Sequence, residues 1–426
     1  MDVMTTSLSP GGLTIYMSTG HVFSDTVHFW LTAPQEGGEG THGTTVNAEP
    51  KQGKKRASMK IVMTESSGGI GGQELAVLLY AEGLRARGHD LSLIVEPGSP
   101  IHWMTKTRHI PVITISMRRA NYASAILAIC SILRRTCPAI VHTNSSRDTW
   151  TASLAARLIR ARPKVIRSRH ISVPLNKNLA TRTLYRRLCD FVIVTGEELT
   201  RRALIERDGL DPRRVDAFPI GIDVTRFRPG IPASDLRQRL GIPNNHRLIG
   251  IVSYLRAYKG HRYLVEAAAQ VLSKIKDVTF VIAGEGPEED NLRTQIKGLG
   301  LTDRILLLGF CQDEVEVMRS LDIFVLPSVE ADTIPQALMQ ALAVGLPVVS
   351  TAFGSIPDVV KHGETGLLAV PRDAASLAEH IITMLQDESL RKRLGANARR
   401  LVESQYSLDR MLDRLESVYE HVLQSR

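Results

Sequence analysis

The chain has 426 residues, of which 43% are hydrophobic and 23% charged, and its formal net charge is +9. This composition is that of a globular protein and excludes a small disulfide scaffold, a collagen-like fibre and a wholly disordered chain. The charge is uneven: residues 1–58 carry a net −1, residues 59–222 a net +12 and residues 223–426 a net −2. The basic middle stretch predicts an anionic partner, such as nucleic acid, a phosphate-bearing ligand or an anionic membrane surface.

The first 58 residues differ from the rest of the chain. Glycines are interspersed there with threonine, serine and proline, and the start lacks the charged and apolar regions of a signal peptide. We therefore expect residues 1–58 to form a poorly ordered leader, with a translation start at Met59 as an open hypothesis.

Cysteine usage and hydropathy indicate in which cellular compartment the protein is expected. Cys130, Cys137, Cys189 and Cys311 form neither a C-x-x-C pair nor a Cys/His metal pattern. We expect reduced, buried thiols in a cytoplasmic protein. No stretch reaches the roughly 18 apolar residues of a membrane span, so no transmembrane helix is predicted.

From Met59 onward, short apolar strands alternate with helical patterns. A helix is predicted over 74–87, where leucines recur at helical spacing and Gly88 follows as a stop signal. The predicted strands of this first half are 60–64, 91–95, 112–116, 139–142, 164–168 and 191–194. Apolar strands alternating with helices predict a parallel sheet covered on both faces, which is a doubly wound α/β domain.

A cluster of prolines and glycines at 229–243 interrupts this pattern and predicts a linker. Alternation then restarts, with strands predicted at 247–253, 278–283, 304–308, 323–327 and 347–351 and helices at 261–274, 374–385, 389–405 and 408–423. Two doubly wound domains would turn the carboxyl edges of their strands toward a shared cleft, where ligands of such folds bind.

Three strand ends carry candidate chemistry. The glycine-rich loop 66–74 opens a helix, so its backbone N–H groups could approach a phosphate, although a simple tight turn explains it equally well. Arg256 and Lys259 precede another helix and could neutralise a diphosphate, the alternative being two solvated cations. His170 follows two arginines at a strand end and could orient a hydroxyl. His142 and Asn144 have weaker claims.

Together these residues resemble a known family. From about Met59 to Val422 the chain is similar to the retaining glycosyltransferases of family 4, which have the two-Rossmann-domain GT-B fold. The resemblance is carried, in this order, by Gly71-Gly72-Gln73-Glu74, Gly221-Ile222-Asp223, Phe227-Arg228-Pro229, Arg256, Lys259-Gly260, Ala283-Gly284-Glu285-Gly286-Pro287, Leu326-Pro327-Ser328, Gly345-Leu346-Pro347-Val348-Val349, Pro357-Asp358-Val359-Val360 and Thr365-Gly366-Leu367-Leu368.

The resemblance implies a division of labour. Residues 59–228 would bind the acceptor, with the helix 408–423 packing back onto them, residues 229–245 would form the linker, and residues 246–407 would bind the nucleotide sugar. It also implies individual roles: Arg256 and Lys259 on the donor diphosphate; Gly71 and Gly72 on the loop that approaches it; Glu285, Gly286 and Pro287 near the nucleotide; and His170 on the donor sugar near the reaction centre.

One position pair departs from the family pattern of two glutamates. Aligned on Pro335 and Ala341, these positions are Asp332, expected to contact the donor sugar, and Gln340, expected to contact the ribose, with Glu330 as an alternative carboxylate. An amide oxygen can still accept a hydrogen bond from a ribose hydroxyl. No Asp-x-Asp motif occurs, so no metal is expected at the diphosphate and no cofactor beyond a UDP- or GDP-linked sugar donor.

The resulting prediction is a retaining transferase that moves a sugar to a cell-envelope glycan or lipid-linked acceptor. The enzyme would lie in the cytoplasm, with peripheral contact to the inner membrane face. Two alternatives stay open: a nucleotide-sugar-binding protein with weak or lost activity, and a GT-B epimerase or phosphorylase. Nucleic-acid binding is disfavoured, because aromatic residues are only 5% of the chain and no recognition motif is found.

Overall fold

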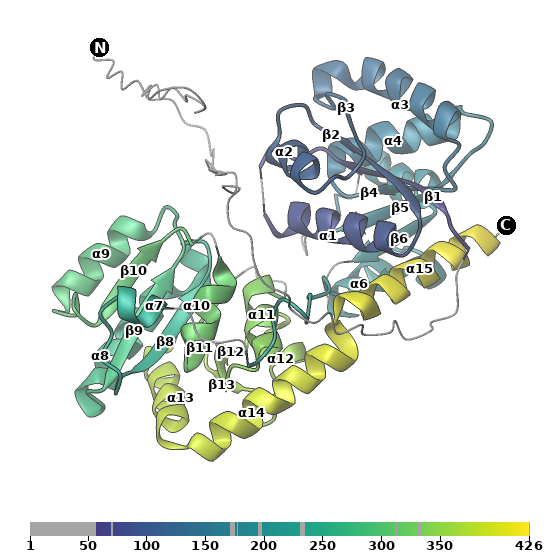
Figure 1. Ribbon diagram of the computed structural model, residues 1–426. Coiled ribbons are helices and arrows are strands. Elements are labelled where there is room, and N and C mark those ends of the chain that lie inside the picture. Colours follow the sequence, from purple (N-terminus) through teal and green to yellow (C-terminus); the bar gives the residue numbers. More distant parts are fainter. Residues whose placement is uncertain are drawn as a thin grey trace, which may run out of the picture. The chain divides into compact units, whose positions relative to one another are not determined.

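The computed structural model describes residues 57–69, 71–170, 175–176, 178–194, 198–230, 235–311, 313–330 and 334–425 (Figure 1). The predicted leader lies outside the described residues except for its last two positions. Asp332 also lies outside them, so its predicted role stays a prediction.

The first half of the chain forms a seven-stranded sheet in which every neighbouring pair of strands is parallel. In spatial order its strands are β3 (Val112–Thr114), β2 (Asp90–Val95), β1 (Lys60–Glu65), β4 (Ile140–Thr143), β5 (Lys164–Arg169), β6 (Phe191–Val194) and β7 (Val215–Ala217). The sequence pattern predicts the first six. It misses β7, because three residues with an aspartate at the centre make no apolar run.

Both faces of this sheet are covered, which explains the unbroken apolar runs of its strands. In β1, Ile61 and Met63 point into one core and Val62 into the other. The first core receives residues from α1 (Gly72–Ala86), α2 (Pro100–Thr107) and α15 (Leu408–Gln424). The second receives residues from α3 (Tyr122–Thr136), α4 (Ser146–Leu158), the turn Leu184–Leu188 that continues α5 (Leu179–Thr183), and α6 (Glu198–Glu206).

The last helix, α15, is thus part of the first half in space although it ends the sequence (Figure 1). Its buried Leu415 and Tyr419 pack in the same core as β1 and α1. A buried hydrogen bond adds to this packing, with Nε2 of His89 and Oε1 of Glu416 2.9 Å apart. Upstream, Gly221 leaves no room for a side chain, since a Cβ there would lie 2.8 Å from Cα of Leu408.

The second half forms a six-stranded parallel sheet. In spatial order its strands are β10 (Ile305–Gly309), β9 (Val278–Ala283), β8 (Arg247–Val252), β11 (Ile323–Leu326), β12 (Val348–Thr351) and β13 (Leu367–Ala369). Its helices are α7 (Leu236–Arg239), α8 (His261–Lys274), α9 (Glu289–Gly298), α10 (Glu314–Ser320), α11 (Gln336–Val344), α12 (Ile356–Val359), α13 (Ala374–Gln386) and α14 (Glu388–Leu401), the last continued by the turn Val402–Tyr406. The predicted fold class, two doubly wound α/β domains, is confirmed.

Two local expectations need correction. Residues 235–245 are more than a connecting chain, because α7 forms there and its Leu236 packs against Ala283 and Val317. All four cysteines are free thiols, but only Cys130 and Cys189 are buried, whereas Cys137 is exposed at the end of α3. Among the described residues, no helix combines the length and the apolar character needed to cross a lipid bilayer.

Candidate active site

Three loops of the six-stranded sheet are joined at the carboxyl ends of neighbouring strands. The loop after β8 meets the loop after β9, since the backbone N–H of Leu255 donates to the carbonyl of Glu285 at 2.8 Å and that of Glu288 donates to the carbonyl of Leu255 at 3.1 Å. The loop after β11 joins them where the N–H of Val329 donates to the carbonyl of Tyr258 at 2.8 Å. We call these three loops the loop cluster.

Glycines make this close packing of loops possible. Gly260 has φ = +76°, and a Cβ at this position would lie 1.9 Å from the carbonyl oxygen of Pro327. Gly284 has φ = +141°, and a Cβ there would lie 1.9 Å from the carbonyl oxygen of Ser253. Glycine is the one amino acid that can adopt this backbone conformation at such a short distance from another carbonyl, because it has no Cβ. The glycines of the sequence motifs therefore hold the loop cluster together.

The loop cluster carries most of the residues predicted to bind the donor. Arg256 is exposed and its guanidinium lies 5.2 Å from the ring centre of Tyr254, while Lys259 is half-buried with Nζ 5.4 Å from the ring centre of Tyr258. Both precede α8: Arg256 comes before the 3₁₀ turn Ala257–Lys259, and Lys259 ends it. Glu285 and Gly286 are half-buried and Pro287 is exposed on the neighbouring loop.

The two polar positions near β11 are arranged differently. Gln340 is buried on α11, the helix that follows the third loop of the cluster. Glu330, the alternative carboxylate, is exposed and forms an ion pair with Arg372. An exposed carboxylate already engaged with an arginine is a weaker candidate for a sugar contact than Asp332, whose placement is not described.

His261, which the sequence analysis did not single out, is the first residue of α8. Its ring is buried, and Nε2 lies 2.9 Å from Oγ of Ser253. Burial, with the neighbouring Lys259, lowers the pKa of His261 to about 4. The imidazole is therefore neutral at physiological pH and adds no charge to the loop cluster. Only the fold could reveal this residue, because a histidine at a helix start has no distinctive spacing.

The other candidate residues lie on the seven-stranded sheet. Gly71 is the residue before α1 and Gly72 is its first residue. Gly71 is extended, and a Cβ there would meet only Oε2 of Glu74 at 3.4 Å. The backbone therefore does not demand glycine at position 71, and a role in approaching a phosphate stays a prediction.

Two buried carboxylates anchor the loop that contains these glycines. Glu65, at the end of β1, accepts hydrogen bonds from the N–H of Ser67 at 2.8 Å and from Nε2 of Gln73 at 2.7 Å. Asp148, in the first turn of α4, accepts one from Oγ1 of Thr64 at 2.6 Å. Burial, and next the nearby Asp148, raise the pKa of Glu65 to about 7. We call Glu65 and Asp148 the carboxylate pair.

His170 follows β5, beside the carboxylate pair. Its Nε2 lies 3.3 Å from Oδ1 of Asn144, and Asn144 in turn donates from its backbone N–H to Oδ2 of Asp148 at 2.9 Å. Desolvation, then the charge of Arg167 and the proximity of His142, lower the pKa of His170 to about 3. His170 is thus a neutral imidazole tied into a network that sequence reasoning could not assemble.

His142 has a structural role. It is fully buried, with Nδ1 2.7 Å from the hydroxyl of Tyr419 on α15 and Nε2 2.7 Å from Oγ of Ser168. Burial, aided by Arg167, lowers its pKa to about 3. Because both ring nitrogens are engaged inside the core, His142 is not a candidate for substrate contact.

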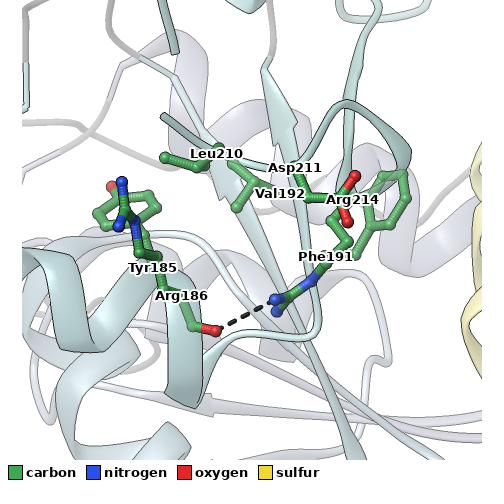
Figure 2. Close-up of a pocket in the computed structure, with 7 residues that line it drawn as sticks. All are labelled: Tyr185, Arg186, Phe191, Val192, Leu210, Asp211 and Arg214. Carbon is green, nitrogen blue, oxygen red and sulfur yellow. Dashed lines mark hydrogen bonds between the residues drawn. The ribbon is translucent and has the colours of Figure 1, made fainter. Parts of the chain in front are cut away.

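Two cavities in the first half do not coincide with these residues. Figure 2 shows the smaller one, of about 20 Å³, where Nη1 of Arg214 donates to the carbonyl of Arg186. Nε of Arg214 also donates to the carbonyl of Asp190, so this guanidinium satisfies backbone carbonyls in and just after the turn Leu184–Leu188. The larger one, of about 270 Å³, lies beside Tyr185 and Arg207, and Arg207 is paired with Asp208. Neither cavity is lined by a predicted catalytic or donor-binding residue.

Comparison with known proteins identifies the two halves separately. Residues 70–226 match the family described as Glycosyltransferase Family 4, and residues 233–401 match the family described as Glycosyl transferases group 1. An N-acetyl-alpha-D-glucosaminyl L-malate synthase of Bacillus anthracis is 30% identical over 45% of this chain and 49% of its own length. A UDP-Gal:alpha-D-GlcNAc-diphosphoundecaprenol alpha-1,3-galactosyltransferase of Escherichia coli is 24% identical over 78% of this chain and 88% of its own.

The match therefore spans about half the length of some of these relatives and most of the length of others. Among solved structures, a glycosyltransferase of Rickettsia africae superposes with a TM-score of 0.79 at 20% identity, covering 87% of this chain and 100% of that one. HepE of Anabaena in complex with UDP superposes with a TM-score of 0.74 at 23% identity, covering 85% and 100%.

Fold and matches together define the class of this protein, which is a GT-B glycosyltransferase. Within that class the chain belongs to the family 4 type, with the family 4 domain followed by a group 1 domain, and so to the enzymes of EC class 2.4.

Proposed function

We propose that this protein transfers a sugar from a nucleotide-diphosphate sugar to a hydroxyl of a glycan or lipid-linked acceptor of the cell envelope, with retention at the anomeric carbon. The observation that carries the proposal is the loop cluster. There Arg256 and Lys259 lie five and two residues before α8, on a loop that is hydrogen-bonded to the loop of Glu285. Two cations beside a helix N-terminus form a binding site for a diphosphate that needs no metal ion.

In this proposal the loop cluster binds the donor. Arg256, Lys259 and the N-terminus of α8 stabilise the negative charge that grows on the departing diphosphate. Glu285, Gly286 and Pro287 lie along the nucleotide, Gln340 contacts the ribose and Asp332 contacts the sugar. The departing phosphate oxygen accepts the proton of the acceptor hydroxyl, so no carboxylate nucleophile is required.

The seven-stranded half binds the acceptor and completes the reaction centre. Gly71 and Gly72 approach the donor from this side, and His170 contacts its sugar. The relatives support a lipid-linked acceptor: the E. coli relative is named for a diphosphoundecaprenol acceptor, and a Corynebacterium glutamicum relative, 30% identical over 47% of this chain, for a phosphatidylinositol monomannoside. Their names contain UDP-galactose and GDP-mannose, which supports a nucleotide-diphosphate sugar as the donor. Experiment must decide between a UDP-linked and a GDP-linked sugar.

We also propose a cytoplasmic enzyme with peripheral contact to the inner membrane face. Four free thiols fit a reducing compartment. The net charge of +12 over residues 59–222 fits an anionic surface, and most of its paired arginines are exposed. The exposed members are Arg118, Arg119, Arg134, Arg135, Arg186, Arg187 and Arg202.

The first experiment measures donor binding. UDP-glucose, UDP-galactose, UDP-N-acetylglucosamine and GDP-mannose are compared for thermal stabilisation of the protein, and the strongest is titrated calorimetrically. We expect the double variant Arg256→Ala, Lys259→Ala to bind it about 100- to 10,000-fold more weakly, since each of the two lost charged hydrogen bonds is worth about 1.5–3 kcal/mol. Lys274→Ala, an exposed cation at the far end of α8, is the control. Unchanged affinity of the double variant would reject the diphosphate site.

Retention and membrane contact have separate tests. Slow hydrolysis of the donor, followed by proton NMR, should release first the sugar anomer present in the donor, and the opposite anomer contradicts retention. Liposomes with anionic lipid should bind the protein at low salt and release it at high salt. Equal binding to neutral liposomes would reject the electrostatic contact.

A further inference from the structure

The stretch of the chain from β2 to β6 is almost free of acidic residues. Between Pro97 and Cys189 the sequence holds 17 lysines and arginines but only one acidic residue, Asp148. Asp148 is fully buried, where it accepts hydrogen bonds from Thr64 and Ser66. The surface formed by this stretch therefore carries positive charges that no acidic side chain of the same stretch offsets. Such a surface attracts anionic partners.

Within this stretch, the outer side of α3 is a regular exposed surface. The inner side of the helix, with Ile129 and Leu133, packs in the second core of the seven-stranded half. On the outer side Leu127 is 70% exposed, although it is a large apolar residue. Helical spacing places small residues and arginines around Leu127. These exposed residues, which we call the α3 outer face, are Ala123, Ser124, Leu127, Ser131, Arg134 and Arg135.

Arginines flank this leucine at both ends of the helix. Arg118 and Arg119 precede α3, and Arg134 and Arg135 belong to its last turn. All four side chains are exposed. In the part of the chain that the structure describes, only Arg118 of these four has an ion-pair partner, with Nε 3.4 Å from Oε1 of Glu96. The other three guanidinium groups are therefore available to an anionic partner.

This arrangement fits a lipid bilayer better than a nucleic acid. The helical rise of about 1.5 Å per residue places Arg134 about 10 Å from Leu127, so the arginines can reach lipid phosphates while the leucine enters the interface. The alanine and serines beside Leu127 are short, so the helix can lie close to a flat surface. Amphipathic helices that lie in the plane of a membrane combine apolar anchors with cations in this way. Proteins that bind single-stranded nucleic acid instead offer aromatic side chains on which bases stack, and the α3 outer face has none.

The other face of the same sheet has a different charge. There α15 packs together with α1 and α2, and its sequence carries four acidic residues against two arginines. By contrast, α3 carries two arginines and no acidic residue. An anionic membrane therefore attracts the face that carries α3 more strongly than the face that carries α15.

We propose that the α3 outer face docks on an anionic lipid bilayer, with Leu127 inserted at the headgroup level and the flanking arginines on lipid phosphates. This inference rests on the membrane contact of the proposed function, for which it names the surface and the orientation. Strands β3 and β4 are parallel, so α3 leads from the carboxyl edge of the sheet back to its amino edge. With α3 flat on the bilayer, the carboxyl edge that holds Asn144 and His170 opens along the membrane surface. A lipid-linked acceptor presents its sugar at that surface.

Two triple variants, each with three exposed arginines changed to glutamine, test the docking surface. The first removes the cations that flank Leu127: Arg119→Gln, Arg134→Gln and Arg135→Gln. The control has the same net charge and removes cations elsewhere in the same half: Arg182→Gln, Arg187→Gln and Arg410→Gln. Binding to vesicles of equimolar phosphatidylglycerol and phosphatidylcholine is measured by sedimentation at low salt. Each basic residue near an anionic leaflet strengthens binding about fivefold, so the first variant should bind about 100-fold more weakly, whereas the control should change little. Equal weakening of both variants would overturn the proposal.

Substitutions of two exposed leucines test the orientation. Leu127→Trp places a fluorophore on the α3 outer face, and Leu423→Trp places one on α15, where the leucine is 40% exposed. With vesicles that contain brominated phosphatidylcholine, we expect quenching of the emission that Leu127→Trp adds to that of the three native tryptophans, and no quenching of the emission added by Leu423→Trp. No quenching at position 127, or equal quenching at both positions, would overturn the orientation. Leu127→Ala should weaken vesicle binding about 10-fold, against little change for Leu423→Ala, and equal binding of these two variants would overturn the role of Leu127 as the apolar anchor.

The outcomes distinguish this inference from the proposed function. Both triple variants should bind the nucleotide sugar as the wild type does, because the changed residues lie outside the loop cluster. Vesicle binding that the first triple variant retains in full would overturn the α3 surface and leave the membrane contact standing. Failure of the wild type to bind anionic vesicles would overturn both, while binding of a nucleotide sugar still decides the donor site. A DNA duplex that binds the wild type but not the first triple variant, with vesicle binding unchanged, would assign the surface to nucleic acid and overturn the proposal.

Discussion

A methyl group at position 260 should open the loop cluster. A Cβ there would lie 1.9 Å from the carbonyl oxygen of Pro327, whereas ordinary contact begins at 3.4 Å, so the loop after β8 and the loop of Pro327 must separate by about 1.5 Å to restore it. The positive φ of +76° adds a conformational cost of about 1–2 kcal/mol for a residue with a Cβ. With the strain of displaced packing, we expect Gly260→Ala to lower the free energy of unfolding by about 2–5 kcal/mol.

The matched control is Gly300→Ala. Gly300 has φ = +69° but open space around its Cβ position, so it should lose only about 1–2 kcal/mol. Urea unfolding measures both stabilities, and calorimetry measures the affinity for UDP and GDP. Because Arg256 and Lys259 move with the loop, Gly260→Ala should also weaken nucleotide binding, while the control should not. Equal stability and equal nucleotide affinity of the two variants would refute the contact with Pro327.

Three further predictions concern pH and packing. Burial raises the pKa of Glu65 from 4.5 to about 7, so the folded state binds this proton more tightly than the unfolded chain and loses roughly 3 kcal/mol of stability as pH rises from 4.5 through 7. The urea midpoint should therefore fall more across this pH range for the wild type than for Glu65→Gln. Parallel plots of midpoint against pH for the two proteins would contradict the raised pKa of Glu65. His142 contributes a pH dependence of the opposite sign, because folding lowers its pKa from 6.5 to about 3. Its contribution to the free energy of unfolding is complete above pH 6.5 and declines by up to roughly 5 kcal/mol toward pH 3. His142→Gln should remove this loss. Leu415→Ala in α15 should cost about 2–5 kcal/mol, against about 0.5 kcal/mol or less for the 40% exposed Leu423→Ala, and equal costs would mean that α15 does not pack as described.

Local patterns in the chain determined the architecture of both halves. Apolar runs such as Val278–Ala283 and Phe191–Val194 are strands with the predicted bounds, because a strand buried on both faces leaves an unmistakable signature. The strands missed, β7 and β13, are three residues long and lie at sheet edges, but β3 shares both properties and was predicted, so short length at an edge makes the pattern weak without removing it. The order of glycine motifs likewise located the loop cluster, since backbone contact between loops requires glycine at particular positions.

The network around His170 depended on tertiary structure alone. Thr64, Asn144 and His170 come from three strand ends that are separated by dozens of residues and become neighbours only because β1, β4 and β5 lie side by side. The protonation of Glu65 and His142 was equally unreadable from the sequence, because a pKa depends on burial and on charges brought near by folding. The position of α15 is a different case: its own pattern predicted only a helix, the family resemblance implied that it packs back onto the first half, and the residues it contacts there come from the fold.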